Sequence, residues 1–238
     1  MRDVKALSQA GGALLQASAD SLQKGLDAYA AGDYSAAAAL VLPLAEAGLA
    51  EAQFWMGAFH ANGEGVAADP KAAYAWCLLA ARQGHVLAQA NLAGMLVQGF
   101  GVAQDHAEAA RWLTLAAESD PVAQFKLATL YARGRGVVED AVAAAAWYRR
   151  AASNGHYPAQ ARLGFLLANG IGTGKDRAEA FVWLSLAAQH GVGTALKALE
   201  EVGGQMSLEE KRRGTALLSR WRGRLGHADN VRLDPVLG

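Results

Sequence analysis

The sequence predicts an all-α protein built as a solenoid of antiparallel helix pairs. Two recurring features predict it. Glycine pairs and aspartates recur at fixed distances, with apolar residues at helical spacing between them. Tryptophans recur at intervals of 36, 35 and 36 residues: Trp76, Trp112, Trp147 and Trp183. A stack of equivalent units buries the same position at each interface and so explains this period, whereas a single core does not.

The composition is that of a folded, core-rich chain. Of the 238 residues 53% are hydrophobic and 18% are charged. Lys+Arg and Asp+Glu number 22 each, so the chain lacks the basic character typical of nucleic-acid binders. No apolar run approaches the ~20 residues of a membrane span. Cys77 is the only cysteine, which excludes a disulfide within the chain and a cysteine-based metal cluster.

Residues 1–20 are predicted to form an alanine-rich helical or flexible segment. A secretory signal is the alternative, because Arg2 and Lys5 precede a weakly apolar stretch and residues 17–19 have the small-x-small form of a cleavage site. Gln9 and Gln16 interrupt the apolar part and favour the helix. We therefore expect a cytoplasmic protein. A periplasmic or secreted location is expected instead if residues 1–19 act as a signal or a leader was removed.

Four repeats follow, at residues 49–84, 85–120, 121–155 and 156–191. Each opens with an Ala-Gln pair or its equivalent, and a large apolar residue stands four positions after the alanine: Met56, Leu92, Leu127 and Leu163. This spacing predicts an amphipathic helix, which we name helix A. A glycine in the left-handed conformation is expected to close its last turn: Gly63, Gly99, Gly134 and Gly170.

An aspartate is predicted to cap the second helix of each repeat, helix B, because its carboxylate can accept from the free N–H groups there. The four are Asp69, Asp105, Asp140 and Asp176. Spread one per repeat, they cannot converge on one substrate atom, which argues against metal or acid–base chemistry. The glycine pair before each aspartate is no phosphate loop, because no strand precedes it and no Lys-Ser/Thr follows it.

Each tryptophan stands in helix B, seven residues after the aspartate and four before an Ala-Ala pair. Residues four apart share one helix face. We expect this pairing of a large and a small side chain to let helix B of one repeat approach helix A of the next.

The pattern A-Q-x-x-[LM]-[GA], G-x-G-V-x-x-D, W and A-A-x-x-G resembles the Sel1-like repeat, a relative of the tetratricopeptide repeat, over residues 49–191. The resemblance implies a right-handed superhelix with helix A on its concave face. Thr173 departs from the pattern, since it replaces the usual valine in the fourth repeat. Residues 21–48 resemble a shorter, tetratricopeptide-like repeat, with a tight turn at residues 31–35.

Capping helices are predicted for residues 192–226 and a tail for residues 227–238. Ser207 and Glu210 form a capping box, and Leu217, Leu218, Trp221 and Leu225 form the apolar stripe of the helix that follows. Terminal repeats need a polar outer face. The basic residues of this helix supply one: Lys211, Arg212, Arg213, Arg220, Arg222 and Arg224. A role in binding anionic lipid or nucleic acid is the alternative, which neighbouring glutamates disfavour.

Residues capable of chemistry do not form a recognisable set. None of the six histidines stands four residues from another histidine or a cysteine, as helical metal ligation would require. Cys77 follows Trp76 inside helix B, where a buried, inert thiol is expected. No Gly-x-Ser-x-Gly elbow occurs. We therefore predict no catalytic residue, no metal site and no cofactor.

The resemblance implies a binding surface on the outward positions of helix A. We expect apolar contacts from Phe54, Phe125 and Phe165, and polar contacts along one edge from Asn62, Gln98, Arg133 and Asn169. Aromatic side chains with a polar rim suit a peptide or a partner helix. The alternative is that some of these phenylalanines pack inside the superhelix.

These observations favour a non-enzymatic interaction scaffold or adaptor that binds a protein or peptide partner, with no nucleic acid and no membrane span. Family resemblance leaves a second possibility, an exported cell-envelope-associated hydrolase or factor. A third is a structural adaptor that associates with itself through its ends. The sequence leaves the partner and the oligomeric state open.

Overall fold

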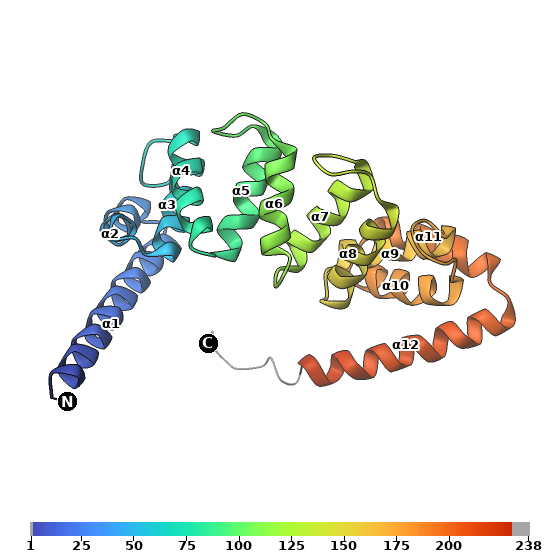
Figure 1. Cartoon of the computed structure of the whole chain (residues 1–238). Helices are drawn as coiled ribbons and strands as arrows, with labels where there is room; N and C mark the ends of the chain where they lie inside the picture. The colour runs from blue at the N-terminus through green and yellow to red at the C-terminus, as the bar shows by residue number, and fades with distance from the viewer. Residues whose placement is uncertain (1, 230–238) are drawn as a thin grey trace. The chain divides into compact units, whose positions relative to one another are not determined.

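The computed structural model describes the backbone of residues 2–229 and the side chains of residues 16–221. All regular secondary structure in this part of the chain is helical (Figure 1). No strand occurs in that part, which confirms the all-α prediction. The helices are α1 (Arg2–Ala30), α2 (Tyr34–Glu46), α3 (Ala50–Asn62), α4 (Pro70–Arg82), α5 (Val86–Gln98), α6 (His106–Ala116), α7 (Pro121–Arg133), α8 (Ala141–Ser153), α9 (Tyr157–Asn169), α10 (Arg177–Gln189), α11 (Gly193–Gln205) and α12 (Leu208–Asp229).

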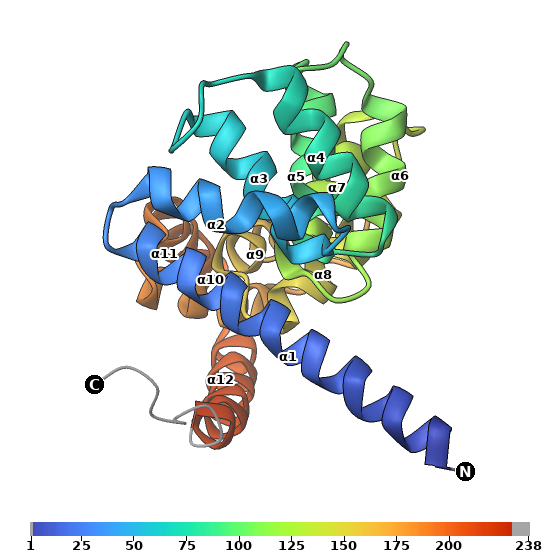
Figure 2. The same cartoon turned by 90° about the vertical axis from the view of Figure 1, so that its left-hand side faces the viewer.

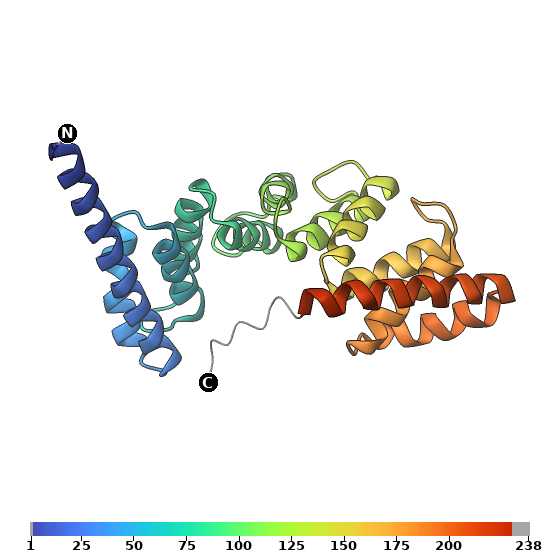
Figure 3. The ribbon, with the colours of Figure 1, turned by 90° about the horizontal axis from the view of Figure 1, so that it is seen from below.

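The chain divides into an N-terminal half, Met1–Ser119, and a C-terminal half, Asp120–Gly238. Within each half, consecutive helices up to α11 pack against one another, as expected for a solenoid of helix pairs, whereas α12 packs against α10. Helix A of the four repeats is α3, α5, α7 and α9, and helix B is α4, α6, α8 and α10. In the N-terminal half, α1 packs along α2 with its C-terminal part and extends beyond it (Figure 2). In the C-terminal half, α12 runs alongside α10 (Figure 3).

The predicted caps are present in all four repeats. Asp69 accepts hydrogen bonds from the backbone N–H groups of Lys71 and Ala72, and Asp105 and Asp140 cap their helices in the same way. Asp176 accepts from the single N–H of Glu179. The glycines that close helix A all have positive φ, at 74°, 72°, 60° and 71° for Gly63, Gly99, Gly134 and Gly170. Each helix boundary is therefore specified by a few local residues.

In three of the four linkers the second glycine is required by a close backbone approach. A Cβ atom at Gly101 would lie 1.9 Å from the carbonyl oxygen of Pro70, the first residue of α4. Gly65 approaches Tyr34, the first residue of α2, at the same distance, and Gly172 approaches the first residue of α8. The linker of one repeat thus rests on the start of the preceding helix B, where no side chain fits.

The last repeated tryptophan is buried more completely than the others. Trp183 is 1% exposed, and its ring centroid lies 4.7 Å from that of Trp221 in α12. Trp76, Trp112 and Trp147 are only partly buried. Helix α12 therefore covers in the fourth repeat a surface that stays partly open elsewhere.

The start of α12 follows the prediction, and its side chains fix it to α10. Glu210 accepts from the backbone N–H of Ser207 at 2.7 Å, and Ser207 Oγ accepts from the N–H of Glu210 at 3.1 Å, which completes the capping box. Arg213 pairs with Asp176 at 2.7 Å. Leu217, Leu218 and Trp221 pack against the core of the C-terminal half.

The helices at the chain ends run across the predicted segment boundaries. Residues 2–20 are helical, and α1 continues across the predicted boundary at residue 20 to Ala30. Asp33 caps α2 by accepting from the N–H of Ala36. Helix α12 continues to Asp229. The remainder of the predicted tail, residues 230–238, lies outside the described residues, as do the side chains of Arg222, Arg224 and Leu225.

Candidate binding site

In the helices A α3, α5 and α9, the glutamine of the Ala-Gln pair joins the helix to the one that precedes it. Gln53 Nε2 donates to the carbonyl oxygen of Ala45 at 3.1 Å. Gln89 and Gln160 donate to the carbonyls of Ala81 and Ala152 at 3.2 Å each. These glutamines are buried, and their amides satisfy carbonyl groups at the ends of α2, α4 and α8. This role was not inferred from the sequence, although a polar residue recurring in a core position could have indicated it.

Two of the predicted phenylalanines stack on histidines that cap the next helix A. His85 and His156 each accept, through Nδ1, the N–H three residues ahead. The ring of Phe54 lies 4.8 Å from that of His85, and the ring of Phe125 lies 4.8 Å from that of His156. Burial lowers the pKa of His156, which favours the neutral ring that this acceptor role needs. Phe54 and Phe125 therefore contribute to packing between repeats.

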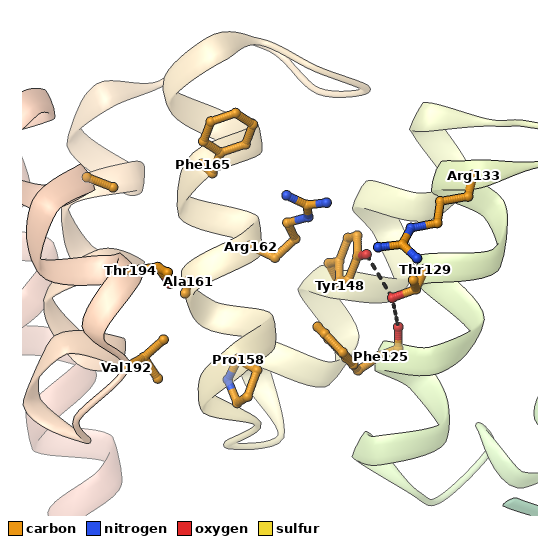
Figure 4. A pocket seen from close by; sticks show the side chains of 11 residues that line it. Phe125, Thr129, Arg133, Tyr148, Pro158, Ala161, Arg162, Phe165, Val192 and Thr194 are labelled. Carbon is orange, nitrogen blue, oxygen red and sulfur yellow. Dashed lines mark hydrogen bonds between the residues drawn. The ribbon is translucent and has the colours of Figure 1, made fainter. Parts of the chain in front are cut away.

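A groove of about 420 Å³ opens on the helix A side of the C-terminal half (Figure 4). Its walls are α7, α9 and the start of α11, and α8 contributes one side chain. The lining residues are Phe125, Thr129, Arg133, Tyr148, Pro158, Ala161, Arg162, Phe165, Val192, Thr194 and Ala198. Small side chains on α9 and α11 leave room between these two helices.

The floor of the groove is apolar and fixed by internal hydrogen bonds. Tyr148 is 1% exposed, and its ring lies 5.5 Å from that of Phe125. Thr129 donates its hydroxyl proton to the carbonyl of Phe125 at 2.9 Å. The Tyr148 hydroxyl lies 3.0 Å from Thr129 Oγ1 and is therefore the donor in that pair. Both hydroxyl protons are used within the protein, so the floor offers a ligand mainly the partly buried ring of Phe125, which the buried Tyr148 supports.

The rim of the groove combines an exposed aromatic ring with two arginines. Phe165 is 44% exposed, and the Arg162 guanidinium lies 5.9 Å from the centre of its ring. Arg133 stands at the last position of α7. None of the lining residues is acidic, and neither arginine has a carboxylate partner among the described residues. The groove is thus apolar below and positively charged above.

The structure brings together some of the residues predicted to bind a partner. Phe125, Arg133 and Phe165 line the groove. Asn169 does not line it and donates instead to the carbonyl of Phe165 at 2.8 Å. The remaining three lie in the N-terminal half: Phe54 stacks on His85, Asn62 donates to Glu64, and Gln98 is exposed at the end of α5.

Several groove residues were missed from the sequence. Tyr148 occupies a position held by Cys77, Leu113 and Leu184 in the other repeats, and this larger, polar substitute was a usable signal. Arg162 was missed because only one stripe of each helix A was considered. Residues of α11 were missed because the binding surface was sought only within the four repeats.

Comparison with known proteins decides the family. The Sel1 repeat model matches residues 50–85, 86–120, 121–156 and 158–192. This chain belongs to the Sel1 repeat family. Sel1 repeats are generally protein–protein interaction modules, and proteins built from them are typically non-catalytic scaffolds. In this Sel1 repeat protein α1, α2, α11 and α12 lie outside the matched residues.

Solved structures of bacterial Sel1 repeat proteins share the fold. A Sel1 repeat protein from Oxalobacter formigenes is 31% identical, with a TM-score of 0.71 over 75% of this chain and 74% of that one. The protein c5321, a protective antigen of uropathogenic Escherichia coli with an SLR fold, is 28% identical, with a TM-score of 0.77. That match covers 91% of this chain and 48% of the antigen. No curated protein matches the sequence.

The described residues contain no group of three or more histidine, cysteine, aspartate or glutamate side chains placed to hold a metal ion. No described helix combines the length and apolar character needed to cross a bilayer.

Proposed function

We propose that this Sel1 repeat protein is a non-enzymatic interaction module whose C-terminal half binds a peptide or partner helix in the groove between α7, α9 and α11. One observation carries the proposal: an open groove of about 420 Å³ has an apolar floor and the half-exposed Phe165 at its rim. Concave sites with a few aromatic side chains and a polar rim are typical of peptide recognition.

The lining of the groove departs from the repeat, which supports a role in specificity. The position of Phe165 is held by Ala58, Gly94 and Thr129 in the other helices A. A residue that serves only the stacking of repeats is expected to recur, as the tryptophans and capping aspartates do. Phe165 does not recur and leaves much of its ring in contact with solvent, so partner binding accounts for it better than packing does.

The side chains that line the groove support the proposal that it is non-catalytic. General acid–base catalysis needs a group that can exchange a proton near neutral pH, and no histidine, cysteine or carboxylate lines the groove. The single thiol lies elsewhere, in α4. Burial raises the pKa of Cys77 to about 11, so this thiol stays protonated and poorly nucleophilic at physiological pH. The alternative of a cell-envelope hydrolase gains no support from these groups.

The proposed location is the cytoplasm. A fusion of alkaline phosphatase to the C-terminus tests it, because that enzyme forms its disulfides only outside the cytoplasm. We expect an inactive fusion. An active fusion would support export instead.

The binding proposal is tested by selecting peptides from a random displayed library with the intact protein and measuring their affinity by fluorescence anisotropy. We expect Phe165→Ala to weaken binding of the selected peptides about tenfold or more, as is usual when a large aromatic side chain that contacts the partner is removed. Leu196→Ala is the matched control, because Leu196 is 55% exposed on α11 but does not line the groove. Equal affinity of both variants for the selected peptides would contradict the proposal.

A further inference from the structure

We propose that the partner segment presents a carboxylate within a few residues of a large apolar side chain, and that Arg133 and Arg162 together bind this carboxylate. This inference rests on the proposed function of the groove and specifies the chemistry of what occupies it. The carboxylate belongs either to an aspartate or glutamate side chain or to the C-terminus of the partner.

The first argument is the absence of internal partners for these two charges. Three other arginines of the C-terminal half have a carboxylate partner within the protein: Arg149 pairs with Glu179, Arg177 with Glu210 and Arg213 with Asp176. Among the described residues no carboxylate pairs with Arg133 or Arg162, and none lines the groove. A protein partner that fills the groove would have to leave both guanidinium groups unpaired or supply an anion.

The second argument is the direction of the two side chains. Arg133 extends from α7 and Arg162 from α9, and both guanidinium groups reach into the space between these helices (Figure 4). The planar guanidinium donates two parallel hydrogen bonds to a carboxylate. Two guanidinium groups on opposite sides of one groove can bind a single carboxylate between them, each donating hydrogen bonds to its oxygens.

The third argument is the low polarity of the surface beneath the arginines. The rings of Phe125 and Tyr148 form the floor, and the hydroxyl of Tyr148 is bound to Thr129. A ligand side chain that covers this floor displaces water from it. Charge-assisted hydrogen bonds strengthen when water is excluded, so the apolar and ionic contacts reinforce one another.

The positions along the helices give the spacing of the ligand groups. Arg133 follows Phe125 by eight residues on α7 and Arg162 follows Pro158 by four on α9, which is about 12 Å and about 6 Å of helix rise. An extended peptide advances about 3.3 Å per residue. The carboxylate is therefore expected about two to four residues from the apolar side chain that rests on the floor.

The test compares peptide selections with the intact wild-type protein, the double variant Arg133→Gln/Arg162→Gln and the double variant Arg212→Gln/Arg220→Gln. Arg212 and Arg220 are exposed on α12, outside the groove, so the control loses the same charge. We expect the wild type and the control to select peptides with an acidic residue or a free C-terminus two to four residues from an aromatic or leucine side chain. The groove variant should keep the apolar preference and lose the acidic one.

Affinities separate the two sources of the carboxylate. A selected peptide is measured by fluorescence anisotropy with its acidic residue changed to the amide, with its C-terminus amidated, and at 50 and 300 mM salt. The change that removes the bound carboxylate should weaken binding to the wild type about tenfold and leave binding to the groove variant unchanged, because charged hydrogen bonds contribute that much. Salt should weaken binding to the wild type more than to the groove variant.

The outcomes distinguish this inference from the proposed function. Selected peptides without acidic enrichment, or enrichment that survives in the groove variant, overturn the inference while binding in the groove stands. Failure of the wild type to select any peptide, or full affinity of the Phe165→Ala variant for the selected peptides, overturns the proposed function itself. Circular dichroism of each variant confirms that the exposed substitutions leave the helices intact.

Discussion

Replacing the second glycine of a linker is expected to destabilise the protein more than replacing the first glycine of the same linker. Gly99 and Gly101 both have φ of 72°, so alanine at either position adopts the same strained backbone conformation. Their surroundings differ. A Cβ at Gly99 has its nearest neighbour at 3.6 Å, whereas a Cβ at Gly101 would lie 1.9 Å from the carbonyl oxygen of Pro70.

The expected difference follows from these distances. The left-handed conformation costs alanine about 1–2 kcal/mol at either position. A carbon and a carbonyl oxygen need about 3.3 Å between them, so Gly101→Ala forces the linker away from α4 by more than an ångström. Backbone shifts of this kind cost about 1–3 kcal/mol. We therefore expect Gly99→Ala to lose about 1–2 kcal/mol and Gly101→Ala about 2–5 kcal/mol.

Thermal denaturation followed by circular dichroism measures this difference. One kcal/mol corresponds to about 2–4 °C in a chain of this size, so the two melting temperatures should differ by about 2–12 °C. Gly172→Ala repeats the test in the C-terminal half, where the same 1.9 Å approach occurs. Equal melting temperatures for Gly99→Ala and Gly101→Ala would refute the argument that the linker rests on the preceding helix.

Three further predictions concern buried side chains. Trp183→Ala should lower the free energy of unfolding by about 3–5 kcal/mol and Trp112→Ala by less, because only Trp183 is fully buried; urea titration compares them. Cys77 should react with a neutral thiol reagent at pH 8 far more slowly in the folded protein than in urea, since its pKa is raised to about 11. The stability that depends on the protonated thiol should be lost as the pH rises toward that value. Stability should also fall as the pH drops below about 6.5, because the pKa of His156 is lowered in the folded protein. The variant His156→Asn can still cap the helix and should lose less stability between pH 7.5 and pH 5. Equal losses of stability for the two tryptophan variants, equal losses for the wild type and His156→Asn, or equal labelling of folded and unfolded protein would contradict these predictions.

Helix boundaries could be predicted from the sequence because each is set by local chemistry. An aspartate that caps and a glycine that adopts positive φ act within a few residues, so Asp69 and Gly63 behave in the structure as the pattern indicates. Recurrence over four repeats strengthened each local signal. The close approach of Gly101 to Pro70 lies beyond such reasoning, because it depends on how one repeat sits on the preceding one.

The candidate site was predictable only in part, because similar side chains have different neighbours. Phe54 and Phe125 lie against histidine rings, whereas no aromatic ring among the described residues packs on Phe165, which stays half-exposed. Sequence alone places all three on helix A but does not show which of them a neighbouring helix covers. The contribution of α11 to the groove was likewise invisible, since it depends on the packing of a helix outside the repeats.

The burial of Trp183 shows the same limit. Its position repeats that of Trp112, yet α12 covers it and brings Trp221 within 4.7 Å. The apolar stripe of α12 predicted a capping helix, but not which surface that helix would cover. The periodicity of the sequence therefore predicts the repeated helices, whereas the neighbours of residues that depart from it are seen only in the structure.

The most direct test of the groove is a map of where a selected peptide binds. Backbone amide shifts of the ¹⁵N-labelled full-length protein are measured as peptide is added. We predict that the largest changes fall on α7, α9 and α11, at residues such as Thr129, Arg162 and Ala198. Changes confined to helices α4, α6 or α12, with those three residues unaffected, would contradict the account.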